Sequence, residues 1–112
     1  MDVLFGTSKL RKQCIDAKLR VRRYGPRRAA LMQRRLDELR AAETLEDIRH
    51  LPGPRCHELI GDRAGQLSLD LDHPYRLLME PANDPVPLQP DGGLDWGLVT
   101  AVRVIEVTDT HG

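Results

Sequence analysis

The sequence has 112 residues and a mass of 12.7 kDa, the size of one domain and not of two. Hydrophobic residues make up 40% and charged residues 30%, which is typical of a globular and not of a disordered chain. The sequence shows no apolar run long enough for a membrane helix, no recognisable signal sequence and only two cysteines, neither in a CxxC pair. We therefore expect a single domain over residues 1–112 in the cytoplasm, without membrane, metal or cofactor.

Charge is distributed unevenly along the chain. Residues 1–40 contain 12 Lys and Arg against 4 Asp and Glu, whereas residues 41–112 contain 5 against 13, so a neutral total hides a basic first half. Fourteen of the 17 cations are arginine, which can contact a phosphate through two N–H groups at once. This asymmetry predicts an anionic partner; the alternative is that these arginines are solvated or pair with the acidic half.

Helical periodicity dominates the first half, after a short possible strand over residues 2–5. Apolar positions at i, i+4, i+7 and i+11 predict one helix over residues 9–23, with a buried stripe formed by Leu10, Cys14, Ala17 and Val21. Gly25 and Pro26 end it and begin a second helix over residues 26–42. Its expected core positions are Ala29, Met32, Leu36 and Leu39, and its arginines, Arg34 and Arg35 among them, are placed on the remaining surface. Thr44 can cap one more turn, as far as about His50.

The second half changes to a period of two. Strands are predicted over residues 55–59, 66–72, 75–80 and 99–109, and the strand over 66–72 places Leu67, Leu69 and Leu71 on one face. Residues 81–97 hold several prolines, glycines and aspartates and are interpreted as one long loop, which Trp96 anchors to the core. The expected fold class is α+β, with two N-terminal helices packed on a small, twisted antiparallel sheet.

Several short segments, in this order, carry a family resemblance. They are Leu51-Pro52-Gly53, His57-Glu58-Leu59, Gly61-Asp62-Arg63-Ala64-Gly65-Gln66, Tyr75-Arg76-Leu77 and the closing residues 104–112, which include Asp109 and His111. The chain resembles the HigB branch of the RelE/ParE toxin superfamily, the "plasmid maintenance system killer" proteins of bacterial type II toxin–antitoxin modules. The resemblance spans nearly the whole sequence and implies a microbial RNase-like fold.

The resemblance also implies an activity and partners. Many HigB-like toxins enter the ribosome and cleave the mRNA there without a metal, so the expected function is that of an mRNA interferase, a ribosome-dependent endoribonuclease that inhibits translation. A helix-turn-helix antitoxin of the HigA type binds and neutralises such a toxin, and the complex can bind operator DNA. The expected partners are this antitoxin, the ribosome and mRNA.

Metal-free RNA cleavage needs groups that move protons and a cation beside the phosphate. The resemblance assigns the proton transfers to His57 and His111, and charge stabilisation to Arg76. Arg63 is a candidate for the RNA backbone, and Arg34 and Arg35 are further candidates for binding phosphate or the antitoxin. Which histidine is the base stays open. Cys56 beside His57 would point to the opposite face of a strand, which argues against a Cys–His nucleophile pair.

Two positions depart from the family pattern. Ile60 stands where some members carry lysine, and Thr110 where some carry tyrosine, so phosphate stabilisation and base positioning are both expected to be weaker. Two other functions therefore remain: inhibition of DNA gyrase without catalysis, as in ParE-type members, and a weakened toxin that acts as an antitoxin-binding partner. The acidic loop residues Asp84, Asp91 and Asp95 suit a protein partner better than RNA.

Overall fold

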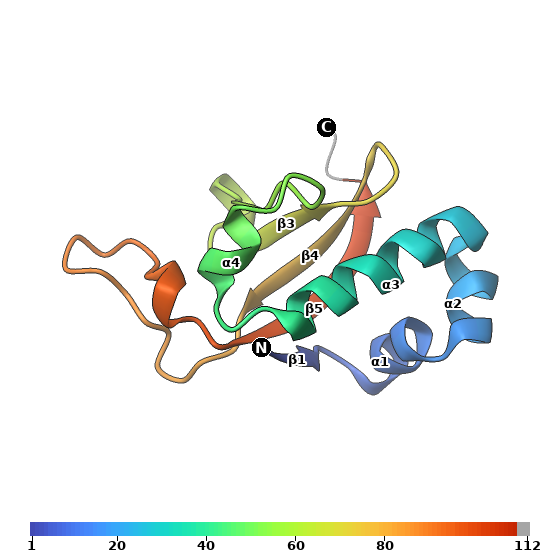
Figure 1. The fold of residues 1–112 in the computed structure, drawn as a ribbon, viewed down its shortest axis with the longest axis horizontal. Helices are drawn as coiled ribbons and strands as arrows, with labels where there is room; N and C mark the ends of the chain where they lie inside the picture. Colours follow the sequence, from blue (N-terminus) through green and yellow to red (C-terminus); the bar gives the residue numbers. More distant parts are fainter. Residues whose placement is uncertain (110–112) are drawn as a thin grey trace.

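The computed structural model describes residues 1–109 and confirms an α+β fold (Figure 1). Four helices and five strands follow one another along the chain, with two short 3-10 helices, η1 and η2, in the second half. Their bounds are β1 Asp2–Phe5, α1 Ser8–Ile15, α2 Ala17–Tyr24, α3 Pro26–Ala41, α4 Leu45–Arg49, β2 His57–Glu58, η1 Gly61–Arg63, β3 Leu67–Asp70, β4 Tyr75–Pro81, η2 Trp96–Leu98 and β5 Ala101–Asp109. None of the helices within residues 1–109 is long and apolar enough to cross a membrane.

The five strands form one sheet in the order β1-β5-β4-β3-β2. Strands β2 to β5 pair antiparallel, but β1 pairs parallel with β5, with Val3 opposite Val102 and Phe5 opposite Val104. The sheet is therefore mixed, and the expectation of a purely antiparallel sheet was wrong. The first and last strands meet because both bring β-branched or aromatic side chains to the same core, across almost the whole length of the sequence.

The single helix predicted over residues 9–23 is two helices. Asp16 separates them, because its carboxylate accepts hydrogen bonds from the backbone N–H groups of Lys18 (2.9 Å) and Leu19 (3.1 Å) and so caps α2. The break ends the predicted stripe: Cys14 is buried, but Val21 is 44% exposed. Arg20 takes the inward position on α2, and its guanidinium donates to the carbonyl oxygen of Cys14 at 2.6 Å.

Helix α3 matches its prediction and covers the core. The structure buries its four expected core positions, of which Met32, Leu36 and Leu39 are at most 1% exposed. They pack with the side chains that β3 and β4 direct to the same side, Leu67, Leu69, Leu77 and Met79. Figure 1 shows α3 and α4 lying across this face of the sheet. The alternate residues of β3 and β4 consequently point to the other face, which we call the second face.

The segment predicted as a loop over residues 81–97 is held in place at both ends. Strand β4 extends to Pro81, and Asn83 Oδ1 accepts hydrogen bonds from the backbone N–H groups of Thr100 (3.0 Å) and Ala101 (3.2 Å). Trp96, in η2, is 5% exposed and belongs to the core, which confirms its predicted anchoring role. The loop projects from one end of the molecule, and α2 forms the opposite end (Figure 1).

A cation on α3 locks the helix layer to the β3–β4 turn. Arg28 forms two hydrogen bonds with Asp72, at 2.9 and 3.1 Å, and its guanidinium lies 3.4 Å from the centre of the Tyr75 ring. Burial raises the pKa of Asp72, but the hydrogen bonds and charge of Arg28, a backbone hydrogen bond and the charge of Arg27 together outweigh burial, so the net pKa lies below its ordinary value. The pair therefore favours the folded state whenever Asp72 is ionised.

We expect Asp72→Asn to lower the free energy of unfolding by about 1 kcal/mol at pH 7. The folded pKa is depressed, so the stabilisation is complete above the unfolded pKa of about 4 and disappears as the pH falls through the folded value. Urea unfolding at pH 7, 5 and 3 checks this. Asp62→Asn, an exposed carboxylate on η1, is the control. Equal losses in both variants at pH 7, or a loss for Asp72→Asn that does not become smaller between pH 7 and pH 3, would contradict the assignment.

Candidate functional site

The second face of the sheet carries most of the predicted catalytic residues. The register places His57 opposite Ser68 and Ser68 opposite Leu78, while Asp70 lies opposite Arg76 and Arg76 opposite Thr108. Directly opposite residues share a face, and so do residues two apart on one strand. His57 and Arg76 are thus on the same face, with Cα atoms separated by two strand spacings and two residues, roughly 12 Å.

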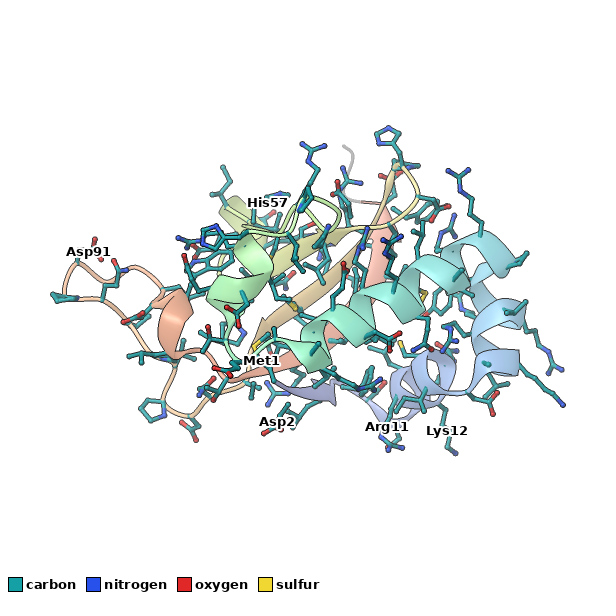
Figure 2. The ribbon with its side chains drawn as sticks, in the orientation of Figure 1. Met1, Asp2, Arg11, Lys12, His57 and Asp91 are labelled. Atoms are coloured by element: carbon teal, nitrogen blue, oxygen red, sulfur yellow. The ribbon has the colours of Figure 1, made fainter. Side chains whose placement is uncertain are left out.

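His57 belongs to the two-residue edge strand β2 and is exposed (Figure 2). Its ring nitrogen Nδ1 lies 3.0 Å from the carbonyl oxygen of Arg55. This contact favours the tautomer in which Nδ1 carries the proton, which leaves Nε2 as the basic nitrogen. His57 can therefore accept a proton from a ligand that lies on this face.

Arg76 is the least exposed cation of the site. Its Nε lies 3.0 Å from Asp70 Oδ1, and Nη1 donates to the carbonyl oxygen of Tyr75 at 3.1 Å. The side chain is 18% exposed, and that of Asp70 is 19% exposed. Asp70 also lies 3.7 Å from the Nε of Arg55, whose side chain is 77% exposed. The carboxylate holds Arg76 in position, and it also competes with any phosphate for the guanidinium.

Arg63 extends across the second face to another carboxylate. Its Nη1 lies 2.8 Å from Glu106 Oε1 on β5 and donates to Gln66 Oε1 at 3.3 Å. Its charged partner is therefore on β5 and is not the neighbouring carboxylate of Asp62. Both members of the pair are more than one-third exposed, so solvent weakens the attraction and Arg63 can exchange partners readily.

The predicted phosphate-binding pair on α3 is not part of this face. Arg34 is exposed, as expected, but Arg35 is buried at 6% exposure, so its placement on the surface was wrong. The guanidinium of Arg35 donates to the carbonyl oxygens of Asp70 (2.7 Å) and Gly53 (3.1 Å) and to Glu38 (2.8 Å). Arg35 thus connects α3 to β3 and to the loop before β2, and each of its three guanidinium nitrogens donates to a protein acceptor.

Two predicted positions lie outside the described residues, namely His111 and Thr110. The described part of β5 ends with Thr108 opposite Arg76 and Asp109 opposite Tyr75, so the last strand runs beside the site. Ile60, the position at which some family members carry lysine, is 91% exposed. Because residue 60 is isoleucine, this exposed position carries no positive charge.

Two acidic residues of the second face, Asp70 and Glu106, were not predicted from the sequence to belong to the site. Asp70 and Arg76 are each three residues from His73 in the sequence, on either side of the turn, so a hairpin places them opposite each other. Their opposite charges could therefore have predicted a cross-strand ion pair. The pairing of Glu106 with Arg63 had no such local sign, because it joins residues 43 positions apart.

The cysteines do not contribute a reactive group to the site. Burial raises the pKa of Cys14 to about 11 and that of Cys56 to about 12, so both are protonated thiols at neutral pH. Within residues 1–109, the structure has no group of three His, Cys, Asp or Glu side chains placed to hold a metal ion.

The site is therefore a charged face of the sheet that carries the exposed imidazole of His57. It also carries Arg63 and Arg76, and each of these two arginines pairs with a carboxylate. Such a face can present cations to a phosphate and an imidazole to a ribose hydroxyl. In comparisons with known proteins, no family model matches this chain and no curated protein matches it.

Proposed function

We propose that this protein is the toxin of a type II toxin–antitoxin module and cleaves mRNA at the ribosome in the bacterial cytoplasm. One observation supports this function above the others: the strand register brings His57 and Arg76 to the same face of the sheet, opposite to the helices. The α+β architecture agrees with the fold that the HigB-like resemblance implies.

In the proposed reaction, the ribose 2′-OH loses its proton and attacks the adjacent phosphate, and the bond from phosphorus to the 5′-oxygen of the next nucleotide breaks. The 5′-oxygen takes up a proton, so the products are a 2′,3′-cyclic phosphate and a 5′-hydroxyl. Arg76 leaves Asp70 and offsets the charge that develops on the phosphate oxygens, and Arg63 holds the RNA backbone. We assign the two proton transfers to His57 and His111, with His57 using Nε2 because Nδ1 faces the Arg55 carbonyl oxygen. A helix-turn-helix antitoxin would neutralise this activity, and the complex would bind operator DNA.

A second candidate function is that of a weakened toxin which retains antitoxin binding only. It is favoured by the ion pairs, because Arg76 and Arg63 each lie 3.0 Å or less from a carboxylate and must break that contact to bind phosphate. The absence of a cation at Ile60 acts in the same direction. DNA gyrase inhibition is the third possibility, and the experiment below distinguishes all three.

The test is pulse-labelling of a bacterial culture after induction of this chain alone, with methionine and thymidine incorporation followed in parallel. We expect methionine incorporation to stop first and mRNA ends to appear within coding regions. If thymidine incorporation stops first, gyrase inhibition replaces the proposal. If neither stops while folded protein accumulates, the weakened toxin replaces it.

A prediction on RNA affinity follows from the Asp70–Arg76 pair. Asp70→Asn removes the competing charge, so we expect binding to a short single-stranded RNA to tighten by about fivefold at low salt. Fluorescence anisotropy with a labelled RNA measures the change. Asp37→Asn removes the same charge from the exposed side of α3 and is the control. Equal tightening in both variants would show an effect of net charge only and would contradict a role for the pair.

A further inference from the structure

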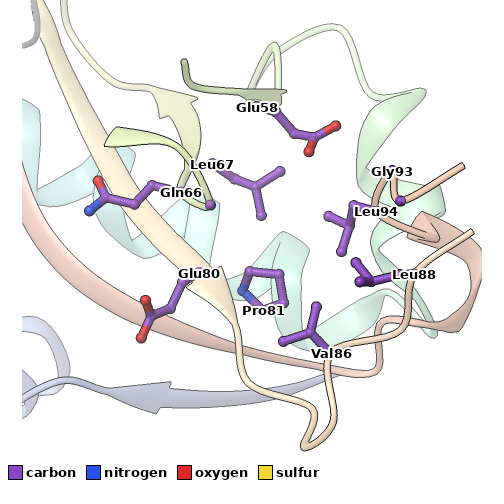
Figure 3. Close-up of a pocket in the computed structure, with 11 residues that line it drawn as sticks. Glu58, Gln66, Leu67, Glu80, Pro81, Val86, Leu88, Gly93 and Leu94 are labelled. Atoms are coloured by element: carbon purple, nitrogen blue, oxygen red, sulfur yellow. The ribbon is translucent and has the colours of Figure 1, made fainter. Parts of the chain in front are cut away.

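We propose that a pocket between the end of the sheet and the acidic loop binds a basic, partly apolar peptide segment of a partner protein. The pocket has a volume of about 360 Å³, which is in the range of ligand sites in proteins. Figure 3 shows apolar side chains around its centre and the Glu58 carboxylate at one side. The inference is independent of the RNA chemistry proposed for the second face.

The walls of the pocket are held in place before any ligand binds. On the loop side, Leu88 and Leu94 form a β-bridge, Gln89 N–H donates to the Gly93 carbonyl oxygen at 2.7 Å, and Asp95 N–H donates to Pro87 at 3.0 Å. On the sheet side, Leu67 is 1% exposed and forms part of the core. A preformed pocket loses little conformational entropy when it is occupied, which favours binding.

The rim of the pocket exposes apolar side chains that the fold leaves uncovered. Val86 is 41% exposed and Leu88 is 60% exposed, and both line the pocket together with Leu94. Aliphatic side chains grouped on one rim, next to a concave site, are a feature of surfaces that bind protein segments. The occupant is therefore expected to contribute at least one aliphatic side chain.

Charge selects a cationic occupant. Glu58 Oε2 accepts a hydrogen bond from the indole Nε1 of Trp96 at 3.3 Å, and its Oε1 has no hydrogen-bond partner among residues 1–109. Arg49 lies over the Trp96 ring, 4.1 Å from its centre, and pairs with Glu46 rather than with Glu58. Residues 81–97 add three aspartates and no Lys or Arg. A lysine or arginine side chain beside an aliphatic one fits this combination.

The same charges exclude nucleic acid from the pocket. The residues that line the pocket include no Lys or Arg. Glu80, the other carboxylate of the lining, is directed away from the centre and lies 2.9 Å from Arg103 Nη1, so Glu58 is the carboxylate that faces the pocket. The basic helices α1 and α2 lie at the opposite end of the molecule (Figure 1). A polyanion would bind that end in preference to the loop, which makes a basic protein segment the consistent occupant.

The indole N–H resonance of Trp96 is a direct reporter, because Trp96 is the only tryptophan of the chain and bonds to Glu58. The experiment is an NMR titration of the full chain with N-acetyl-Leu-Arg-Leu-amide and with its neutral analogue N-acetyl-Leu-Gln-Leu-amide. We expect a saturable shift of the indole resonance and of the Gly92 and Gly93 amides. The neutral peptide is expected to bind about fivefold more weakly.

Two variants and a matched control locate the effect. Glu58→Gln keeps a hydrogen-bond acceptor for Trp96 but removes the negative charge, so the charged and the neutral peptide should bind with equal affinity. Leu88→Ser removes an apolar contact and should weaken the binding of both peptides. Leu98→Ser replaces a leucine that is also 60% exposed but does not line the pocket, and it should bind like the parent. The proposal is overturned if no saturable shift occurs up to about 10 mM peptide. It is also overturned if Glu58→Gln keeps the preference, or if concentrating the protein alone produces the shifts, which would indicate a second copy as occupant.

Discussion

Under the proposed function, replacing Arg76 with alanine is expected to lower mRNA cleavage by about 10²- to 10³-fold and to relieve the growth arrest that expression of the parent chain would cause. The reason is that the proposed transition state places negative charge next to this guanidinium, and removal of one such donor from an enzyme typically has an effect of this size. Primer-extension mapping of mRNA ends, at matched protein levels, measures the change.

Arg103→Ala is the matched control for Arg76→Ala. Arg103, on β5, is also a strand arginine that pairs with a carboxylate, Glu80 at 2.9 Å, but it lies one strand farther from His57 than Arg76 does. We expect its cleavage to stay within a factor of a few of the parent protein. Equal losses in the two variants, with thermal unfolding unchanged, would contradict a specific role for Arg76.

The largest effect on stability is expected at Arg35. Arg35→Ala should lower the free energy of unfolding by about 3 kcal/mol, because it leaves a partly buried carboxylate and two carbonyl oxygens without their donor. Equilibrium unfolding in urea measures this loss. At a temperature where the variant is folded, its affinity for RNA should equal that of the parent, because the guanidinium does not reach the second face.

Arg34→Ala is the natural comparison, since it removes the same group one residue earlier. Arg34 is exposed, and its removal should change the free energy of unfolding by no more than about 0.5 kcal/mol. If Arg35→Ala were as stable as Arg34→Ala, the buried hydrogen bonds of Arg35 would contribute nothing to the fold. If Arg35→Ala lost RNA binding while folded, its original assignment as a phosphate ligand would be restored.

The two proposed surfaces of this protein differ in charge and in the class of partner. The second face combines arginines with an imidazole, and the pocket combines aliphatic side chains with one available carboxylate. A ligand of one surface is therefore a poor ligand of the other. RNA cleavage and peptide binding can be tested independently on the same purified chain, and failure of one leaves the other standing.

Much of the local structure follows from the sequence alone. The stripe of apolar residues from Ala29 to Leu39 predicted α3 within one residue at its end, because a helix of that length buries one face and shows its period clearly. The alternation around Leu67 and Leu69 likewise predicted a strand with one buried face. Since strand neighbours alternate, His57 and Cys56 could be assigned to opposite faces without a structure.

One local cap and the tertiary structure decided the rest, and each case has a physical reason. Asp16 ends α1 because its carboxylate caps α2, a local bond that outweighs a continuous apolar period. The parallel pairing of β1 with β5 depends on residues almost a hundred positions apart, which no local pattern records. Arg35 stands three residues after Met32, at the border of the buried stripe, and became structural because backbone carbonyls of β3 and of the loop before β2 surround its guanidinium. The sequence by itself determined most of the helical and strand segments and which residues can carry charge or protons; only the packing of distant segments decided which arginines face a ligand and which hold the fold together.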